Sequence, residues 1–203
     1  MINKYKIYIF HPYSQIGGAD LSISRLINNL SKKKYDIDFI FLNKENLSKY
    51  LSKREVNFVK IKSKRTIFSL PIIRNYLIQD KKKNYSKYIF LSNQNFANIL
   101  SFPILFNLNW IKHILIERNH IDEFKYNKSF KKLIIFKLTK YLYRHSDAII
   151  GISKKLSLDL SKYVKKKCIT IYNPAFDKNI FNLSRRKISI KKNKNTILTV
   201  GRL

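Results

Sequence analysis

Short apolar runs alternate with longer amphipathic stretches along almost the whole chain of 203 residues, and this alternation constrains the fold more than any other feature. A short apolar run indicates a buried strand, whereas apolar side chains three and four residues apart indicate a helix that packs on one side. Strands that alternate with helices favour a mostly parallel sheet with helices on both faces. The pattern therefore predicts an α/β fold built on such a sheet.

The expected elements follow from these two periodicities. Strands are expected at residues 5–10, 36–42, 56–61, 88–91, 111–116, 148–152, 169–172 and 196–200. Helices are expected after Gly18, within 43–52, and at 70–83, 94–106, 128–144 and 153–164. Pro71 is tolerated at a helix start, and Pro103 is expected to kink its helix. The polar, basic segment 184–195 indicates a linker, which predicts a domain over 1–183 and the first strand of a second domain over 196–203.

A strand, two glycines and a helix follow one another between Ile7 and Leu30. Gly17 and Gly18 precede the helix, and Asp20 lies in its first turn, where a negative charge suits the helix dipole. Backbone N–H groups at a helix start can bind an oxyanion, and glycine both permits positive φ and lets a ligand approach closely. A tight turn without a ligand is the more common meaning of so short a motif, so both interpretations stay open.

Two polar clusters directly follow expected strands. Asn93, Gln94 and Asn95 can hydrogen-bond sugar hydroxyls or cap the next helix, and the sequence favours neither role. The second cluster, Glu117-Arg118-Asn119-His120, follows the strand at 111–116. Arginine can hold a phosphate or carboxylate in a fork, and histidine can transfer a proton. Because ligands of parallel sheets bind at the carboxyl ends of the strands, we expect a ligand site here.

The composition excludes several classes of protein. The chain carries 42 Lys+Arg against 12 Asp+Glu, a formal charge of +30, which favours anionic partners unless it reflects a bias spread along the whole chain. Cys168 is the only cysteine, so neither an internal disulfide nor a cysteine metal cluster is expected. No nucleophile elbow, HExxH motif or P-loop is present. The remaining histidines, expected in loop or structural positions, are His11, His113 and His145.

The chain is expected to be cytoplasmic and to hold neither a metal nor a cofactor. No apolar run reaches the roughly 20 residues that span a bilayer. The first residues form an expected strand rather than a signal peptide.

Several segments, in this order, resemble the N-terminal half of glycosyltransferase family 4. The matching segments are GGAD, SNQNFANIL, LIERNH, DAIIGISKKL, IYNPAFD and ILTVGRL. The resemblance implies a GT-B fold, in which one Rossmann-like domain binds the acceptor and a second binds the nucleotide sugar. It therefore implies the acceptor-side domain of a retaining hexosyltransferase in cell-surface polysaccharide synthesis. Its partners would be a nucleotide sugar and a glycan or lipid-linked acceptor.

The resemblance also implies roles for the residues that match. His120 would be catalytic, and Arg202 would contact the donor phosphate. The acceptor side of the cleft would be lined by Gly17, Gly18, Asn93, Gln94, Asn95, Glu117, Arg118, Asn119 and Ser153. Because the chain ends at Leu203, before the donor motif of the family, it is expected to be inactive alone.

Two further interpretations depend on the basic residues. The first is a nucleic-acid-binding α/β protein without catalysis, but lysines are spread through nearly all elements and no nucleic-acid motif is present, so no specific nucleic acid is expected. The second concerns the helix at 128–144, whose apolar face either packs on the core, which is slightly favoured, or contacts an anionic membrane from the cytoplasmic side. The basic residues beside this face are Lys128, Lys131, Lys132, Lys137, Lys140 and Arg144.

Overall fold

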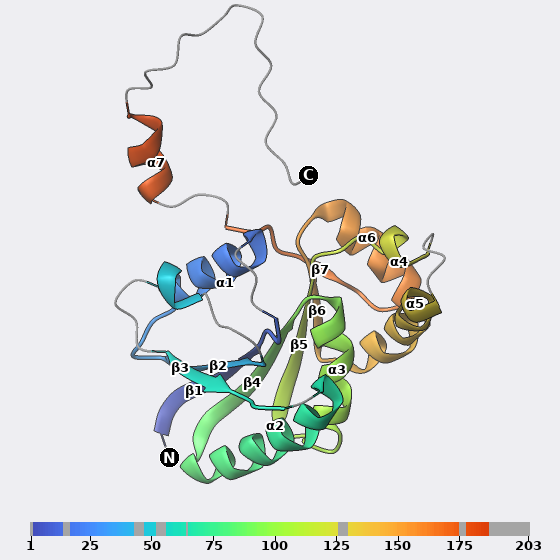
Figure 1. Ribbon diagram of the computed structural model, residues 1–203, viewed down its shortest axis with the longest axis horizontal. Coiled ribbons are helices and arrows are strands. Elements are labelled where there is room, and N and C mark those ends of the chain that lie inside the picture. The colour runs from blue at the N-terminus through green and yellow to red at the C-terminus, as the bar shows by residue number, and fades with distance from the viewer. Residues whose placement is uncertain are drawn as a thin grey trace, which may run out of the picture.

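A seven-stranded sheet forms the centre of the molecule (Figure 1). The computed structural model describes residues 2–13, 17–42, 47–51, 56–63, 65–125, 130–174 and 178–186. The strand order is β3-β2-β1-β4-β5-β6-β7, and all neighbouring strands are parallel, which confirms the expected α/β, Rossmann-like fold. The strands are β1 (Ile2–Phe10), β2 (Tyr35–Phe41), β3 (Asn57–Lys60), β4 (Tyr85–Asn93), β5 (Ile111–Glu117), β6 (Ala148–Gly151) and β7 (Ile169–Thr170).

Helices cover both faces of the sheet (Figure 1). The α-helices are α1 (Gly18–Asn29), α2 (Thr66–Asp80), α3 (Asn95–Leu105), α4 (Asp122–Lys125), α5 (Phe130–Leu142), α6 (Lys154–Val164) and α7 (Lys178–Ser184). The short 3-10 helices are η1 (Leu47–Tyr50), η2 (Lys81–Lys83) and η3 (Tyr143–His145). The chain first adds β2 and β3 on one side of β1, and then crosses over to add β4, β5, β6 and β7 on the other side. Helix α1 accordingly packs on one face of the sheet, whereas α2, α3, α5 and α6 pack on the opposite face.

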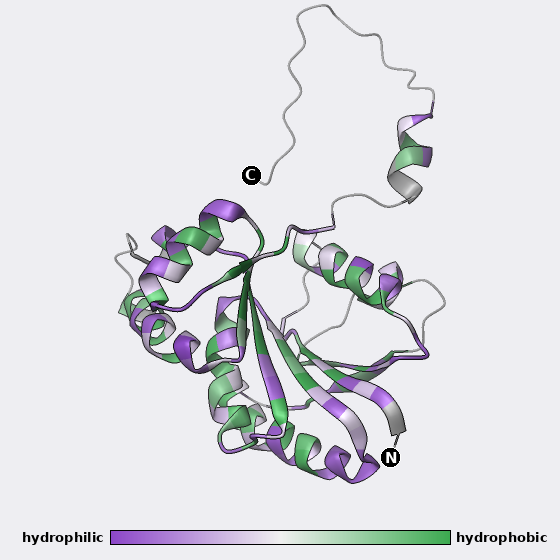
Figure 2. Cartoon of the chain, turned by 180° about the vertical axis from the view of Figure 1, so that it is seen from behind, coloured by the Kyte–Doolittle hydropathy of each residue, from purple (hydrophilic) through white to green (hydrophobic). Residues whose placement is uncertain are grey.

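The core has one part on each face of the sheet, because successive side chains along a strand point to opposite faces. On β1, Ile7 and Ile9 pack with α1, whereas Tyr8 and Phe10 point to the face covered by α2 and α3. In Figure 2 the carboxyl-terminal parts of the central strands are mostly hydrophobic, whereas their amino-terminal parts also carry hydrophilic residues. Strands that are buried on both faces read as continuous apolar runs, which is why the sequence shows them so clearly.

Some element boundaries differ from the expectation. Helix α2 begins at Thr66, so Pro71 lies inside the helix rather than at its start. Strand β7 spans only Ile169–Thr170, and the short helices α4 and α7 were not expected. The predicted boundary at 183 falls at the end of α7. From residue 187 onward, the predicted linker and the strand at 196–200 lie outside the described residues.

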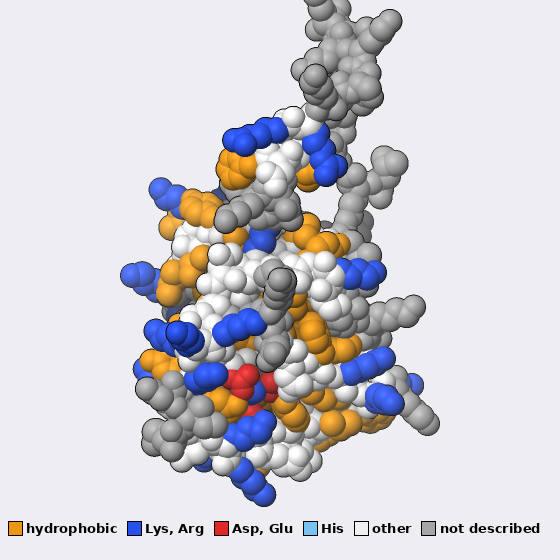
Figure 3. All heavy atoms as spheres, turned by 90° about the vertical axis from the view of Figure 1, so that its left-hand side faces the viewer, with side chains coloured by type: hydrophobic (Ala, Val, Ile, Leu, Met, Phe, Trp, Pro, Cys, Tyr) orange, Lys and Arg blue, Asp and Glu red, His pale blue; other side chains and the backbone are white. Residues whose placement is uncertain are grey.

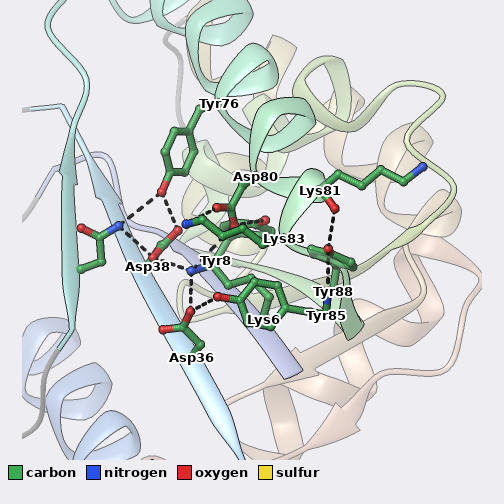
Figure 4. A network of polar contacts seen from close by, with 11 residues as sticks. Lys6, Tyr8, Asp36, Asp38, Tyr76, Asp80, Lys81, Lys83, Tyr85 and Tyr88 are labelled. Atoms are coloured by element: carbon green, nitrogen blue, oxygen red, sulfur yellow. Dashed lines mark hydrogen bonds and ion pairs between the residues drawn. The ribbon is translucent and has the colours of Figure 1, made fainter. Parts of the chain in front are cut away.

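A buried ionic network joins β1, β2 and α2 near the amino ends of the strands (Figure 4). The Lys6 Nζ atom lies 3.0 Å from Asp36 Oδ2, 2.8 Å from Asp38 Oδ1 and 3.8 Å from Asp80 Oδ2. Hydroxyl groups donate to the same three carboxylates, from Tyr8, Tyr76 and Tyr85. A second cation, Lys83, lies 2.7 Å from Asp80 Oδ1, so each charged group of the network has a partner within the fold, which indicates a structural role.

Candidate functional site

Polar side chains gather where the carboxyl ends of β1, β4 and β5 lie side by side. The strand order reverses between β1 and β4, and ligands of open α/β sheets bind at such a switch point. Side chains from the end of β4, from the segments that follow β1 and β5, from α1 and from the segment after β7 form one group, called here the Arg118 cluster. Its members are His11, Asp20, Ser22, Asn93, Arg118 and Asn173.

Arg118 connects the cluster. Its Nε donates to Asn93 Oδ1 at 2.6 Å, and its two terminal nitrogens donate to Asn173 Oδ1 at 2.8 Å and to Ser22 Oγ at 3.3 Å. Burial lowers the pKa of Arg118 to about 10, while the nearby Asp20 and Glu117 carboxylates oppose this shift. The guanidinium therefore stays cationic at neutral pH, and these three hydrogen-bond partners are neutral oxygens. Such a cation is suited to attract an anionic ligand group.

His11 belongs to the cluster, although the sequence predicted only a loop position for it. Its side chain is buried, and Nδ1 lies 3.0 Å from Asn93 Nδ2. Because Arg118 donates to the amide oxygen of Asn93, the amide nitrogen faces His11, so Nδ1 accepts and Nε2 carries the proton. Nε2 lies 3.2 Å from Asp20 Oδ1, at ion-pair distance but without hydrogen-bond geometry. His11 directly follows β1, just as the other polar clusters directly follow their strands. This position is the signal that sequence reasoning missed.

Glu117 and Asn95 lie beneath this site rather than in it. The Glu117 carboxylate is buried and accepts the backbone N–H groups of Arg118 at 2.9 Å and Asn119 at 3.1 Å. It also accepts from Tyr143 Oη at 2.6 Å and from Asn95 Nδ2 at 3.2 Å. Burial raises the pKa of Glu117, while these hydrogen bonds act in the opposite direction. Glu117 thus fixes the turn after β5 and positions Arg118.

His120 contacts a different group of residues. Its Nε2 lies 3.0 Å from Asp159 Oδ2 and its Nδ1 lies 3.2 Å from Asp122 Oδ2. These residues line a hollow of about 480 Å³ beside α4, α5 and α6, together with Phe136 and Tyr163. A separate space of about 170 Å³, lined partly by Ser22, Arg118 and Asn173, adjoins the Arg118 cluster. Among the described residues, side-chain contacts therefore join Arg118 to Asn93, whereas those of His120 lead to Asp122 and Asp159 instead.

The remaining predicted site residues lie at helix starts or in turns. Gly17 is the N-cap of α1 in an extended conformation, and neither glycine has positive φ, so the backbone does not require glycine there. A Cβ on Gly18 would meet nothing within 4 Å, which leaves open space at the helix start. Gln94 is the N-cap of α3, and Ser153 caps α6, its Oγ accepting the Leu156 N–H at 3.3 Å. Arg202 lies outside the described residues.

Among the residues that the structure describes, no group of three or more His, Cys, Asp or Glu could hold a metal ion. In the same part of the chain, no helix has the length and apolar character needed to cross a membrane. A larger cavity of about 900 Å³ lies at the opposite end of the sheet, near the amino ends of β5 and β6, beside Phe102, Leu108 and His113. It is remote from the polar groups of the Arg118 cluster.

Comparison with known proteins identifies the fold. No protein-family model and no curated protein matches the sequence. Among solved structures, the apo form of the lipopolysaccharide outer core galactosyltransferase WaaB matches with a TM-score of 0.54 at 15% identity, over 84% of this chain and 46% of that chain. Anabaena HepE in complex with UDP and glucose matches with a TM-score of 0.57 at 13% identity, over 86% of this chain and 46% of that chain.

The fold is one shared with GT-B glycosyltransferases. The chain spans about half the length of these two structures, since it covers 46% of each. At this level of identity the similarity concerns the fold alone.

Proposed function

We propose that this chain is the acceptor-side domain of a glycosyltransferase that uses a nucleotide-sugar donor. The observation that supports the proposal most is the Arg118 cluster at the switch point of a sheet that has the fold of WaaB and HepE. A cationic fork beside a helix N-terminus suits a phosphate or carboxylate group. The HepE structure contains UDP and glucose, which supports a nucleotide sugar as the donor.

The finer assignments belong to the same proposal. The α1 N-terminus at Gly17 and Gly18 would face the anionic part of a substrate, and Asn93 with Arg118 would orient it. His120 would act from its hollow beside Asp159 when substrate reaches that position. Family 4 membership, a retaining hexosyl transfer, and a glycan or lipid-linked acceptor in cell-surface polysaccharide synthesis rest on the sequence resemblance. Contact of Arg202 with a donor phosphate has the same basis.

Ligand binding tests this proposal without requiring turnover. Saturation-transfer NMR with UDP, UDP-glucose and oligosaccharide fragments should show binding to the chain. Arg118→Met should weaken binding of the anionic ligands at least about tenfold, since hydrogen bonds to charged groups contribute about 1.5–3 kcal/mol. Lys112→Met is the matched control, because this exposed lysine pairs with Asp147 near the amino ends of the strands, away from the Arg118 cluster. Equal binding by the Arg118 and Lys112 variants, or no binding at all, would contradict the proposal.

Nucleic-acid binding is the alternative function, and less supports it. On the face shown in Figure 3, the Lys and Arg side chains are scattered rather than gathered into one stripe. Concentrated basic patches are the usual footprint of nucleic-acid-binding domains. A gel-shift assay with DNA and RNA at physiological salt tests the alternative, because nonspecific binding weakens steeply as salt rises. Retention of a tight shifted band under those conditions would favour it.

A further inference from the structure

Helix α5 has an apolar outer face. Its inner side packs on the core through Ile135, Phe136, Leu142 and the buried Thr139. The outward side chains are nevertheless large and apolar, with exposed fractions of 74% for Phe130, 62% for Tyr141, 41% for Leu133 and Ile134, and 37% for Leu138. The apolar face expected from the sequence comprises Phe130, Leu133, Ile134, Leu138, Tyr141 and Leu142. The slightly favoured expectation that this face packs on the core is therefore wrong, apart from Leu142. A surface helix normally carries polar residues on its outer side, so this face calls for a partner.

The charges on this outer face have a single sign. Lys137, Lys140 and Arg144 are exposed on the same side of α5 and η3, between and beside the apolar residues. At 100° per residue, Lys137 falls between Leu133 and Phe130 around the helix, and Arg144 and Lys140 fall on either side of Leu133. Lys132 falls on the other side of the helix, where its Nζ lies 3.7 Å from Glu123 Oε1. The remaining predicted basic residues, Lys128 and the side chain of Lys131, lie outside the described part of the structure.

We propose that the outer face of α5 docks on an anionic lipid surface. Aromatic and aliphatic side chains can enter the boundary between headgroups and acyl chains, while long basic side chains reach the lipid phosphates. A second copy of this chain is a poor occupant, because two such faces would bring Lys137, Lys140 and Arg144 against their equivalents. Helix α5 lies on a side of the molecule away from α1 (Figure 1). A bound membrane would therefore leave the Arg118 cluster accessible.

Vesicle flotation with the full 203-residue chain tests this proposal and does not depend on sugar transfer. The chain should float with phosphatidylglycerol vesicles and much less with phosphatidylcholine vesicles. Changing Lys137, Lys140 and Arg144 together to Glu should reduce partitioning at least about tenfold, since each basic residue near an anionic surface contributes about 1 kcal/mol. The matched control changes the exposed Lys33, Lys155 and Lys167 to Glu, which alters the net charge equally and should reduce partitioning much less.

A second pair of variants separates apolar insertion from charge. Phe130→Ser with Tyr141→Ser should also weaken flotation, whereas Ile67→Ser with Phe68→Ser should not. The control residues on α2 are similarly exposed, at 63% and 59%, but belong to another helix. Circular dichroism checks that all variants are folded. Failure of the wild-type chain to float, equal loss in the control variants, or a stable dimer in sedimentation that the α5 changes dissolve would overturn the proposal.

Discussion

His113 is a buried residue whose protonation the fold opposes. Burial lowers its pKa from 6.5 to about 4, with the Lys166 charge acting in the same direction and Asp147 opposing. Between these two pH values the unfolded chain binds a proton that the folded chain does not. The free energy of unfolding therefore falls as the pH decreases from about 6.5 to 4, by up to about 3 kcal/mol. Urea unfolding at pH 7.5, 6 and 5 measures this loss.

Substitution of His113 by Gln should flatten that pH dependence. The Ser101 hydroxyl donates to the Asn98 carbonyl at 2.6 Å, so His113 Nε2 donates to Ser101 Oγ, also at 2.6 Å. Glutamine keeps a donor for this hydroxyl but does not titrate. His145→Gln, which changes an exposed histidine, is the control. The assignment is wrong if His113→Gln loses as much stability between pH 6.5 and 5 as the wild-type chain does.

Gln94 has a backbone conformation that glycine adopts more easily. Its φ of 79° and ψ of 152° lie in a region occupied almost only by glycine, at a cost of about 1–3 kcal/mol. Its N–H donates to the Ile116 carbonyl and its carbonyl accepts from Asn98, which hold it in place. Gln94→Gly should therefore raise the free energy of unfolding by about 1 kcal/mol. Gln94→Ala should not, because alanine keeps a Cβ, and an equal gain from both would refute the strain.

For single residues, the sequence predicted where polar side chains gather better than it predicted which residues each side chain contacts. It predicted a site at the strand ends, and the structure places Asn93 and Arg118 within hydrogen-bonding distance there. It could not show that the Glu117 side chain turns back into the fold to accept two backbone N–H groups. Nor could it show His11 reaching Asn93 across 82 positions of the chain. Strand ends can be read from local periodicity, but the direction of each side chain depends on neighbours that are distant in sequence.

At the scale of elements, the Lys6 network joins β1 and β2 to the end of α2. Lys6 is 2% exposed and lies between the Asp36, Asp38 and Asp80 carboxylates. Lys6→Met should lower the free energy of unfolding by about 3–5 kcal/mol, because it leaves the fully buried Asp38 carboxylate without a cation. Lys87→Met removes an exposed lysine from neighbouring β4, whose Nζ lies 5.5 Å from the centre of the Tyr5 ring, and should change the free energy of unfolding by less than about 1 kcal/mol. Equal urea midpoints for the two variants would show that Lys6 has no such role.

The same network shows why element boundaries were harder to predict than element types. Strands β1 and β4 are longer than their apolar runs, since β4 spans Tyr85–Asn93 where only 88–91 was expected. The additional residues include Tyr85, whose hydroxyl donates to Asp36 on β2. Polar residues at the end of a strand break the apolar pattern while a distant partner still holds them in the sheet. Helix α5 shows the converse, because its apolar stripe correctly predicted a helix but not the side that faces the core.

At the scale of the whole molecule, the candidate site adjoins only a small space. The Arg118 cluster lies at the carboxyl ends of the central strands of a single sheet, and the space beside it measures only about 170 Å³. Sugar transfer requires donor and acceptor to be held in register, which can contribute about 7–11 kcal/mol to lowering the barrier. It also requires the exclusion of water, which two closing surfaces commonly provide. This chain covers 46% of the length of both WaaB and HepE.

We therefore expect the 203 residues alone to bind ligands without transferring sugar. The measurement is release of nucleoside diphosphate from a panel of nucleotide sugars, with and without oligosaccharide acceptors, using WaaB as the positive control. Arg118→Ala is assayed in parallel, because any turnover that persists in this variant comes from a contaminating enzyme rather than from this site. Transfer that the wild-type chain sustains and Arg118→Ala abolishes would show that one domain is enough. In that case the small space beside Arg118 must hold donor and acceptor together, without a second domain to close over them.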